Sequence, residues 1–407
     1  MIPPSEYKKN SLQDKINPFI QRIEKLKKEN SYFYLQSIEG PSGPRVRING
    51  IEKINLSSYN YPSIVNHPKI IKAAIKAIKE YGAGTAGVRL LAGTSPIHKE
   101  LEAKIAEFKG AEDAVTYSSG YVTNLTVVST LCGIADLVIM DKLDHASIID
   151  GCMLSGADHK TYLHNNMESL EKILADSKKK YEGKFKLVIV DAVYSMDGDI
   201  ANLPEISRLA KKYDAYLMVD EAHSIGHIGK TGHGIEEHFN MKGAVDIHMG
   251  TLSKAIPSIG GYIAGDKDLI TYLKHGSRAF IFSASIPQVN IAIAKASLEV
   301  IESEPWRMTR LHNRAEQFRK GLKKIGYDIG YSNTALIPIM IRDEEKTLKL
   351  ARLINDRGLF IMPIIFPAVP KNTDRLRTHV QAGHTKKDIS NALDILKESG
   401  KELGILK

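Results

Sequence analysis

Six short apolar runs, separated by stretches with helical patterning, occupy the chain between Ser57 and Pro287. This alternation is typical of a sheet built from strand–helix–strand units. The runs are DAVTYSS, DLVIMD, KLVIVDAV, AYLMVDEA, DIHMGT and GGYIAG. Several are apolar at successive positions, as expected for strands that helices cover on both faces. The sequence therefore predicts an α/β fold with a mostly parallel central sheet flanked by helices.

The flanks of this region have a different pattern, which indicates three parts. With 407 residues, the chain is long enough for a large core and a smaller second one. A charged helical stretch and the turn-rich GPSGPRVRINGIEKINLSS suggest an amino-terminal arm over residues 1–56. The large domain is expected over 57–288. Long helices, the strand-like ALIPIMI and a final helix with capping-box spacing at Thr385 and Asp388 predict a smaller α+β domain over 289–407.

Composition narrows the class of protein and its compartment. No segment reaches the roughly 18 apolar residues of a membrane span, and no apolar run follows the charges of MIPPSEYKKNSLQDKINPF, so we expect no secretory signal there. Only Cys132 and Cys152 are present, without metal-ligand spacing, so we expect no metal site and buried thiols in a reducing compartment. These features predict a cytoplasmic protein.

The formal net charge is +9. The lysines are scattered along helices such as HPKIIKAAIKAIKEYG instead of alternating with aromatic residues in one patch, which argues against nucleic acid. In that helix Ile71, Ala74, Ile75 and Ile78 form an apolar stripe, and the lysines are expected to face water. The charge is explained either by a solvated lysine-rich surface or by a phosphate-bearing or acidic partner.

Two predicted strands end close to residues that could do chemistry. Asp220 ends a strand in VDEAHSIG, and Lys254 follows the next strand in TLSKAIPSIGG. Ligands of open parallel sheets bind at the carboxyl ends of the strands, so both residues are expected in one crevice. A lysine that forms a Schiff base and a carboxylate that keeps a pyridine nitrogen protonated suit pyridoxal 5'-phosphate (PLP). A lone lysine after a strand is more commonly solvated, so Lys254 is a candidate only together with the other motifs of the chain.

Seven motifs, including the two just named, make up the full set. They are GAGTAGVRLLAGTSPIHKELE, YSSGYVTN, LDHASIIDG, VYSMDGDIANLPEI, VDEAHSIG, TLSKAIPSIGG and SRAFIFSASIP. In this order they resemble the α-oxoamine synthases, and the resemblance covers residues 50 to 400. Members of this family are fold-type-I PLP-dependent transferases. They condense an amino acid with an acyl thioester, lose carbon dioxide and release an aminoketone.

The resemblance implies catalytic roles for four residues. Lys254 would bind the cofactor and, once displaced by substrate, remove the α-proton, and Asp220 would hold the pyridine nitrogen. His145 would stack on the cofactor ring, although without the resemblance it is an ordinary loop histidine. His223 would donate a hydrogen bond to the phenolic oxygen. Ser195 would lie near the same edge of the cofactor, or be a simple turn residue.

Other cofactor contacts follow from the same resemblance. Gly120 and Tyr121 stand where a strand gives way to a helix, so their N–H groups could bind the cofactor phosphate. Thr251 would add a hydroxyl. Ser283 and Ala284 would reach the phosphate from the neighbouring subunit, which predicts a homodimer.

The carboxy-terminal stretch PAVPKNTDRLRTHVQAGHT aligns Arg377 with the family arginine that binds the substrate carboxylate. An ordinary surface arginine is the alternative. The chain departs from the family at Ala368, where a threonine is common, and at Thr378 and His379 beside the arginine. These departures make the substrate pocket atypical.

The motifs do not decide which amino acid and which acyl thioester the protein uses. SSYNYP and SRAFIFSASIP look like serine palmitoyltransferase, whereas GVRLLAGTSPIHKELE looks like aminoketobutyrate ligase. The arm stretch ENSYFYLQS lacks an arginine that biotin-pathway members can carry, which disfavours a pimeloyl donor.

We therefore predict a PLP-dependent C-acyltransferase that joins glycine, alanine or serine to an acyl-CoA or acyl-carrier-protein thioester. An aminotransferase, or another fold-type-I PLP reaction, is the alternative. A non-catalytic partner subunit is disfavoured because the candidate catalytic residues occur together.

Overall fold

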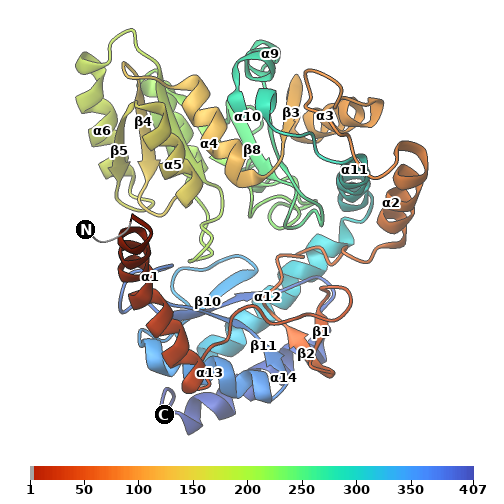
Figure 1. The fold of residues 1–407 in the computed structure, drawn as a ribbon, viewed down its shortest axis with the longest axis vertical. Helices are drawn as coiled ribbons and strands as arrows, with labels where there is room; N and C mark the ends of the chain where they lie inside the picture. Colours follow the sequence, from red (N-terminus) through yellow and green to blue (C-terminus); the bar gives the residue numbers. More distant parts are fainter. Residues whose placement is uncertain (1–3) are drawn as a thin grey trace.

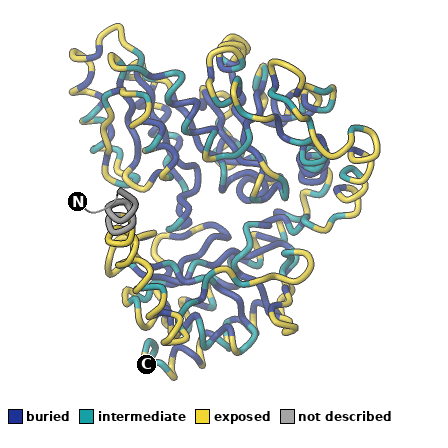
Figure 2. Tube along the Cα trace, viewed as in Figure 1, coloured by how far each residue is buried: buried dark blue, intermediate teal, exposed yellow. Residues whose placement is uncertain are grey.

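The computed structural model describes residues 4–407, which contain three β-sheets. Figure 1 shows the largest sheet and its helices in the upper body, and the two smaller sheets in the lower body. Buried residues follow the strands of both bodies, and exposed residues follow the outer helices (Figure 2).

The large sheet has seven strands in the order β3-β9-β8-β7-β6-β4-β5. In this order the strands are Asp113–Tyr117, Gly261–Gly265, Ile247–Thr251, Tyr216–Asp220, Lys186–Asp191, Leu137–Asp141 and Asp158–Tyr162. Strand β9 runs antiparallel to both its neighbours, β3 and β8, and the five strands from β8 to β5 in this order pair in parallel. The predicted mostly parallel sheet is confirmed.

Both faces of this sheet are covered, as the apolar runs predicted. Along β6, Val188 and Val190 pack into one hydrophobic cluster, and Leu187 and Ile189 pack into another on the opposite face. The upper body contains helices α2 (Pro68–Tyr81), α3 (Pro96–Lys109), α4 (Gly120–Leu131), α5 (Ala146–Ser155), α6 (Met167–Lys180), α7 (Leu203–Lys212), α8 (Ile235–Phe239), α9 (Lys267–Gly276), α10 (Arg278–Phe282) and α11 (Gln288–Ser303).

Two features of the upper body differ from the sequence pattern. Strand β5, with the sequence DHKTY, was not predicted, because it is an edge strand with three exposed central residues. Helix α2 is present, but Ile71, Ile75 and Ile78 of its apolar stripe are 41%, 52% and 52% exposed. The helix instead buries Ile70 and Ala77, on the side that packs against α11.

The lower body contains an antiparallel sheet of β10 (Leu336–Met340), β13 (Arg375–His379) and β12 (Met362–Ile364). Helices α12 (Trp306–Ile325), α13 (Glu344–Asp356) and α14 (Lys386–Glu402) pack around it. The predicted capping box at the start of α14 is confirmed.

The amino-terminal segment joins the lower body. It consists of α1 (Pro4–Lys28), β1 (Arg45–Ile48) and β2 (Ile51–Asn55), and β2 pairs in parallel with β11 (Leu359–Phe360). The division of the chain at residues 57 and 289 stays a prediction. Within residues 4–407, none of the helices is long and apolar enough to cross a membrane.

Candidate active site

Polar side chains at the carboxyl ends of three neighbouring strands face one cavity. Asp191 ends β6, Asp220 ends β7 and Thr251 ends β8, and the register sets Asp191 opposite Asp220. Lys254 follows Thr251 by three residues. The cavity has a volume of about 240 Å³. Its walls include seven predicted cofactor residues, namely Gly120, Tyr121, His145, Asp220, His223, Thr251 and Lys254.

Two fixed donors orient the Asp220 carboxylate. Asn124 Nδ2 donates to Oδ2 over 2.6 Å, and the N–H of Ala222 donates to Oδ1 over 2.8 Å. Asn124 comes from α4, is buried, and donates a second hydrogen bond to Ser147 Oγ at 2.9 Å. Sequence reasoning missed Asn124. Asn124 could have been found from the sequence, because it follows Gly120 by one helical turn and therefore lies on the same side of the helix.

Lys254 is half-buried, and its amine is easier to deprotonate than an ordinary lysine. Burial lowers its pKa to about 8, although the carboxylates of Asp220 and Asp191 oppose the shift. Its Nζ lies 5.7 Å from the ring centre of Tyr59. A substantial fraction of this amine is therefore neutral near physiological pH.

Asp191 is a second acid in the cavity that sequence reasoning missed. It is buried, and no described residue hydrogen-bonds its Oδ1. Burial, with the nearby Asp220 and Asp144, raises its pKa well above the usual range, so Asp191 holds a proton more tightly than an ordinary aspartate. Its position at the end of a buried strand, the signal that singled out Asp220, could have found it.

His145 is the N-cap residue of α5. Ser147 Oγ lies 2.7 Å from its Nδ1. Because Asn124 donates to that hydroxyl, the hydroxyl can in turn donate to the imidazole. Burial lowers the pKa of His145, so the ring facing the cavity is neutral.

The amino terminus of α4 offers donors to an anion. Ser119 caps the helix by accepting from Val122 N over 3.1 Å, and the N–H groups of Gly120 and Tyr121 have no intrahelical partner. A Cβ on Gly120 would lie 2.9 Å from Thr251 Oγ1, so a side chain there would crowd that hydroxyl. The Ser119 and Ser253 hydroxyls also line the cavity, and sequence reasoning did not single them out.

Arg377, on β13, lies beside the cavity but not among its lining residues. Its Nη1 donates to the carbonyl oxygen of Ser195 over 3.2 Å, and its Nη2 donates to the Tyr59 hydroxyl. The Tyr59 ring centre lies 5.4 Å from Arg377 Cζ and 5.7 Å from Lys254 Nζ, so this ring contacts both cationic side chains. Tyr59 was not predicted as a site residue, although it stands in the quoted SSYNYP motif.

Thr378 and His379, the two residues beside Arg377 at which the chain departs from the family, have different surroundings. Thr378 donates its hydroxyl hydrogen to Ile337 O at 2.6 Å, within the small sheet. His379 lies on the same face of β13 as Arg377, and its ring packs edge-on against Tyr59 at 4.8 Å. It is buried, and within residues 4–407 neither ring nitrogen has a hydrogen-bond partner. Burial lowers its pKa well below the usual range.

The single chain does not bring Ser283 and Ala284 into this cavity. They follow α10, and Ala284 forms an isolated bridge with Val88. Neither residue lines the cavity.

The cavity residues fit PLP. A helix amino terminus with hydroxyl groups suits a phosphate, an oriented carboxylate suits a pyridinium nitrogen, and a lysine with a lowered pKa suits an aldehyde. A neutral, planar imidazole at the wall suits a ring face.

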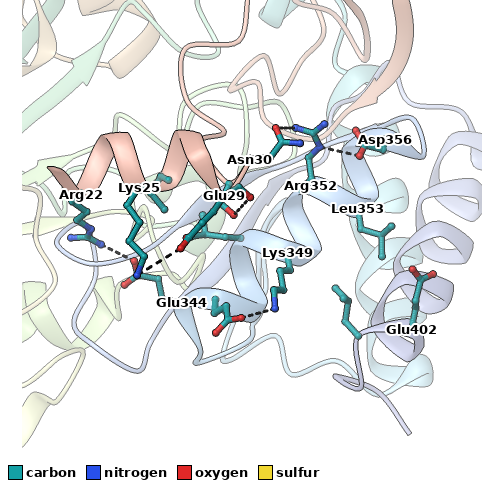
Figure 3. Close-up of a pocket in the computed structure, with 15 residues that line it drawn as sticks. Arg22, Lys25, Glu29, Asn30, Glu344, Lys349, Arg352, Leu353, Asp356 and Glu402 are labelled. Atoms are coloured by element: carbon teal, nitrogen blue, oxygen red, sulfur yellow. Dashed lines mark hydrogen bonds and ion pairs between the residues drawn. The ribbon is translucent and has the colours of Figure 1, made fainter. Parts of the chain in front are cut away.

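A larger cavity of about 800 Å³ lies between α1 and α13 (Figure 3). Its charged groups pair with one another or with a neighbour, in the pairs Arg22–Glu344, Lys25–Glu29, Lys349–Glu345, Arg352–Asp356 and Arg357–Glu402. Most of these side chains are exposed, so each pair contributes little. This cavity offers no group poised for chemistry.

Comparisons with known proteins identify the family of the chain. Residues 51–396 match the family Aminotransferase class I and II. An 8-amino-7-oxononanoate synthase of Thermoanaerobacter pseudethanolicus is 45% identical over 386 residues, covering 95% of this chain and 97% of that protein. The 8-amino-7-oxononanoate synthase 1 of Bacillus subtilis is 43% identical over 384 residues, covering 94% and 97%.

Among solved structures, a serine palmitoyltransferase variant from S. paucimobilis with a bound PLP–myriocin aldimine matches with a TM-score of 0.92. It is 32% identical and covers 97% of this chain and 100% of its own. The chain therefore belongs to the aminotransferase class I and II family of fold-type-I PLP enzymes, and within it to the α-oxoamine synthases, which join an amino acid to an acyl thioester.

Proposed function

We propose that Lys254 carries PLP in this chain and that the cavity around it performs the α-oxoamine synthase reaction. The observation that carries the proposal is the convergence of Lys254, Asp220 and His223 on one cavity at the sheet edge. When bound, PLP supplies an electron sink for the carbanion formed at the Cα of the amino acid.

The remaining cavity residues would hold the cofactor. The N–H groups of Gly120 and Tyr121, with the Thr251 hydroxyl, would bind the phosphate. Asp220 would keep the pyridine nitrogen protonated, and the hydrogen bonds from Asn124 and Ala222 fix the orientation of its carboxylate. His145 would lie against the ring face.

Lys254 would also handle the α-proton. With a pKa of about 8, a substantial fraction of this amine is neutral near pH 7.5 and can accept a proton at its Nζ, and it remains basic enough to do so. The carboxylates of Asp220 and Asp191 then stabilise the ammonium that results.

Arg377 would orient the substrate. A planar guanidinium pairs with a carboxylate through two N–H donors, which fixes the bond at Cα that lies perpendicular to the cofactor ring. The contacts of Arg377 with the Ser195 carbonyl and the Tyr59 hydroxyl hold the guanidinium at the edge of the cavity.

We propose that the active form is a homodimer in which Ser283 and Ala284 complete the phosphate site of the partner. Neither residue serves the cavity of its own chain. Nearby, Leu91 and Phe282 are 84% and 76% exposed, as expected of an apolar surface that a second copy covers. Sedimentation of the PLP-loaded protein should give a dimer, and Phe282→Glu should shift it towards monomer.

The relatives favour one substrate pair. The product in their name is a nine-carbon acid with an amine next to a ketone. Alanine, after loss of its carboxylate, supplies the two carbons at the amine end, so a seven-carbon dicarboxylate thioester supplies the rest. We propose alanine and a pimeloyl thioester for this chain, in spite of the arginine missing from ENSYFYLQS.

A second candidate pair is serine with a long acyl thioester. Tyr59 in SSYNYP and the match to serine palmitoyltransferase favour it. In either case the buried, free Cys132 and Cys152 suit a reducing compartment, and we propose a cytoplasmic location.

The test is a spectral titration of the PLP-loaded protein with alanine, serine and glycine, followed by thiol release from pimeloyl-CoA and palmitoyl-CoA. We expect alanine to shift the visible band and pimeloyl-CoA to release thiol. Serine with palmitoyl-CoA would support the second candidate. Conversion of the cofactor to pyridoxamine phosphate would indicate an aminotransferase instead. The Lys254→Ala variant should lack the visible band, and its retention would contradict the proposal.

A further inference from the structure

A hydrogen bond links a residue of the cavity wall to a buried tyrosine that does not itself line the cavity. Tyr61 is completely buried, and its hydroxyl lies 2.9 Å from Nδ1 of His223, which is 162 residues away in sequence. Within residues 4–407, this is the only hydrogen bond of that hydroxyl. His223 lines the cavity, and its Nε2 has no protein partner in the same range. Nε2 is thus the nitrogen left for a ligand.

The ring of Tyr61 is fixed by a second histidine. It stacks on His227 with the ring centres 4.0 Å apart and the planes 7° apart. His227 Nδ1 contacts the carbonyl oxygen of His223 at 2.6 Å, and the N–H of Ala335 points to Nε2 at 2.9 Å. A carbonyl only accepts and an amide only donates, so the proton of His227 must be on Nδ1. Burial lowers the pKa of His227 to about 3, which agrees with a neutral ring.

The protons of the Tyr61–His223 pair can then be counted. Burial, with the charges of Lys254 and Arg377, lowers the pKa of His223 well below its usual range, so the ring is neutral. Burial raises the pKa of Tyr61 well above its usual range, so the phenol keeps its hydrogen. The pair therefore holds one O–H and one ring N–H, and two arrangements are possible.

The two arrangements differ in what they leave unsatisfied. If Nδ1 carried the ring proton and donated to the tyrosine, the phenol hydrogen would be buried without an acceptor among the described residues. A buried donor without a partner disfavours that arrangement by roughly 5- to 150-fold. If the phenol donates to Nδ1, its hydrogen is satisfied and the ring proton is on Nε2, facing the cavity.

We propose that Tyr61 is a positioning residue that fixes the tautomer of His223, so that His223 presents an N–H donor to the cavity. The inference rests on the proposed function in one respect, since the acceptor that meets Nε2–H would be the phenolic oxygen of PLP. Tyr61 does not touch the ligand. It acts through His223, and His227 keeps its hydroxyl in place.

The test compares the wild-type chain with Tyr61→Phe, which keeps the ring but removes the hydroxyl. Tyr162→Phe is the matched control, because Tyr162 is also buried and no described residue hydrogen-bonds its hydroxyl. Each full-length protein is labelled with ¹⁵N-histidine, and long-range ¹H–¹⁵N spectra are recorded with and without PLP. The His223→Gln variant identifies the His223 signals.

In the wild type and the control, we expect one protonated nitrogen, Nε2, and one bare nitrogen, Nδ1, without titration between pH 6 and 9. In Tyr61→Phe, both nitrogens should move towards averaged positions in the PLP-free protein. In that variant only the fraction of His223 with its proton on Nε2 can donate to the cofactor, so an even mixture of the two tautomers should lower the affinity for PLP about twofold.

A wild-type spectrum with the proton on Nδ1, or with a charged ring, would overturn the inference even if Tyr61→Phe does not fold. So would a His223 signal that Tyr61→Phe leaves unchanged. The tautomer is also measured without PLP, so failure of the proposed function is distinguishable. A protein that binds no PLP but shows the expected tautomer would contradict the proposed function and support the role of Tyr61.

Discussion

The lowered pKa of Lys254 predicts how fast the PLP-free protein takes up its cofactor at each pH. Only the neutral amine attacks an aldehyde. With a pKa of about 8, about a quarter of Lys254 is neutral at pH 7.5, against about 0.1% of a lysine at the ordinary value of 10.5. The uptake rate should therefore rise about fivefold from pH 7 to 8, and only about 1.1-fold from pH 9 to 10.

The assay is stopped-flow absorbance after mixing PLP with the cofactor-free protein. The series starts at pH 7, because the phosphate itself titrates near pH 6. Lys254→Arg should show no visible band. Asp220→Asn should move the midpoint below the wild-type value, because the Asp220 carboxylate raises the pKa of Lys254. A rate that keeps rising tenfold per pH unit through pH 10 would refute the reasoning, since it would give Lys254 an ordinary pKa.

Three further predictions concern stability. Gly183→Ala should lower the free energy of unfolding by about 1–2 kcal/mol, the strain of a positive φ, and Gly198→Ala by clearly more. Both glycines have a positive φ, but only at Gly198 would a methyl group overlap the carbonyl oxygen of the first residue of β10. Lys109→Met should cost about 3–5 kcal/mol, because it leaves Glu221 buried without the cation now 2.6 Å away. Partial burial opposes the charged form of His164, but hydrogen bonds to two carboxylates outweigh it and raise the pKa of His164 to about 10. The charged imidazole therefore stabilises the fold fully below pH 6.5, and this contribution to the free energy of unfolding is lost as the pH rises from 6.5 to 10.

Urea denaturation at fixed pH measures the first two effects, and a pH series measures the third. Equal losses for the two glycine variants would contradict the predicted overlap. For the lysine, Lys180→Met is the control, because its pair with Asp158 is 66% and 36% exposed and should contribute less than about 1 kcal/mol. A His164→Asn protein that keeps the same slope between pH 7 and 10 would show that the imidazole is not its cause.

Sequence reasoning worked where a residue's environment is fixed by its own strand. Four central strands have no exposed residue, so they read as continuous apolar runs and were predicted. The expectation that Asp220 and Lys254 share one crevice follows from this, because the ends of neighbouring parallel strands meet at one edge. Strand β5 was not predicted, because it lies at the sheet edge, pairs on one side only and has polar side chains.

The sequence did not show which side chains support the site from behind. Asn124, Asp191, Tyr59 and Tyr61 all lie in or behind the cavity, and none was singled out for a role there. Asn124 and Tyr61 act on residues 96 and 162 positions away, through hydrogen bonds of 2.6 and 2.9 Å. Such contacts have no periodicity along the chain.

The sequence alone therefore determined the α/β sheet, the strand ends that carry the chemistry and the family motifs around Lys254. The tertiary structure decided how these groups titrate, since the lowered pKa values of His223 and Lys254 and the raised pKa of Asp191 each depend on burial and on neighbours from distant segments. The physical reason is that hydrophobic patterning is a local property of the chain, whereas desolvation and hydrogen-bond partners exist only after the segments have packed together.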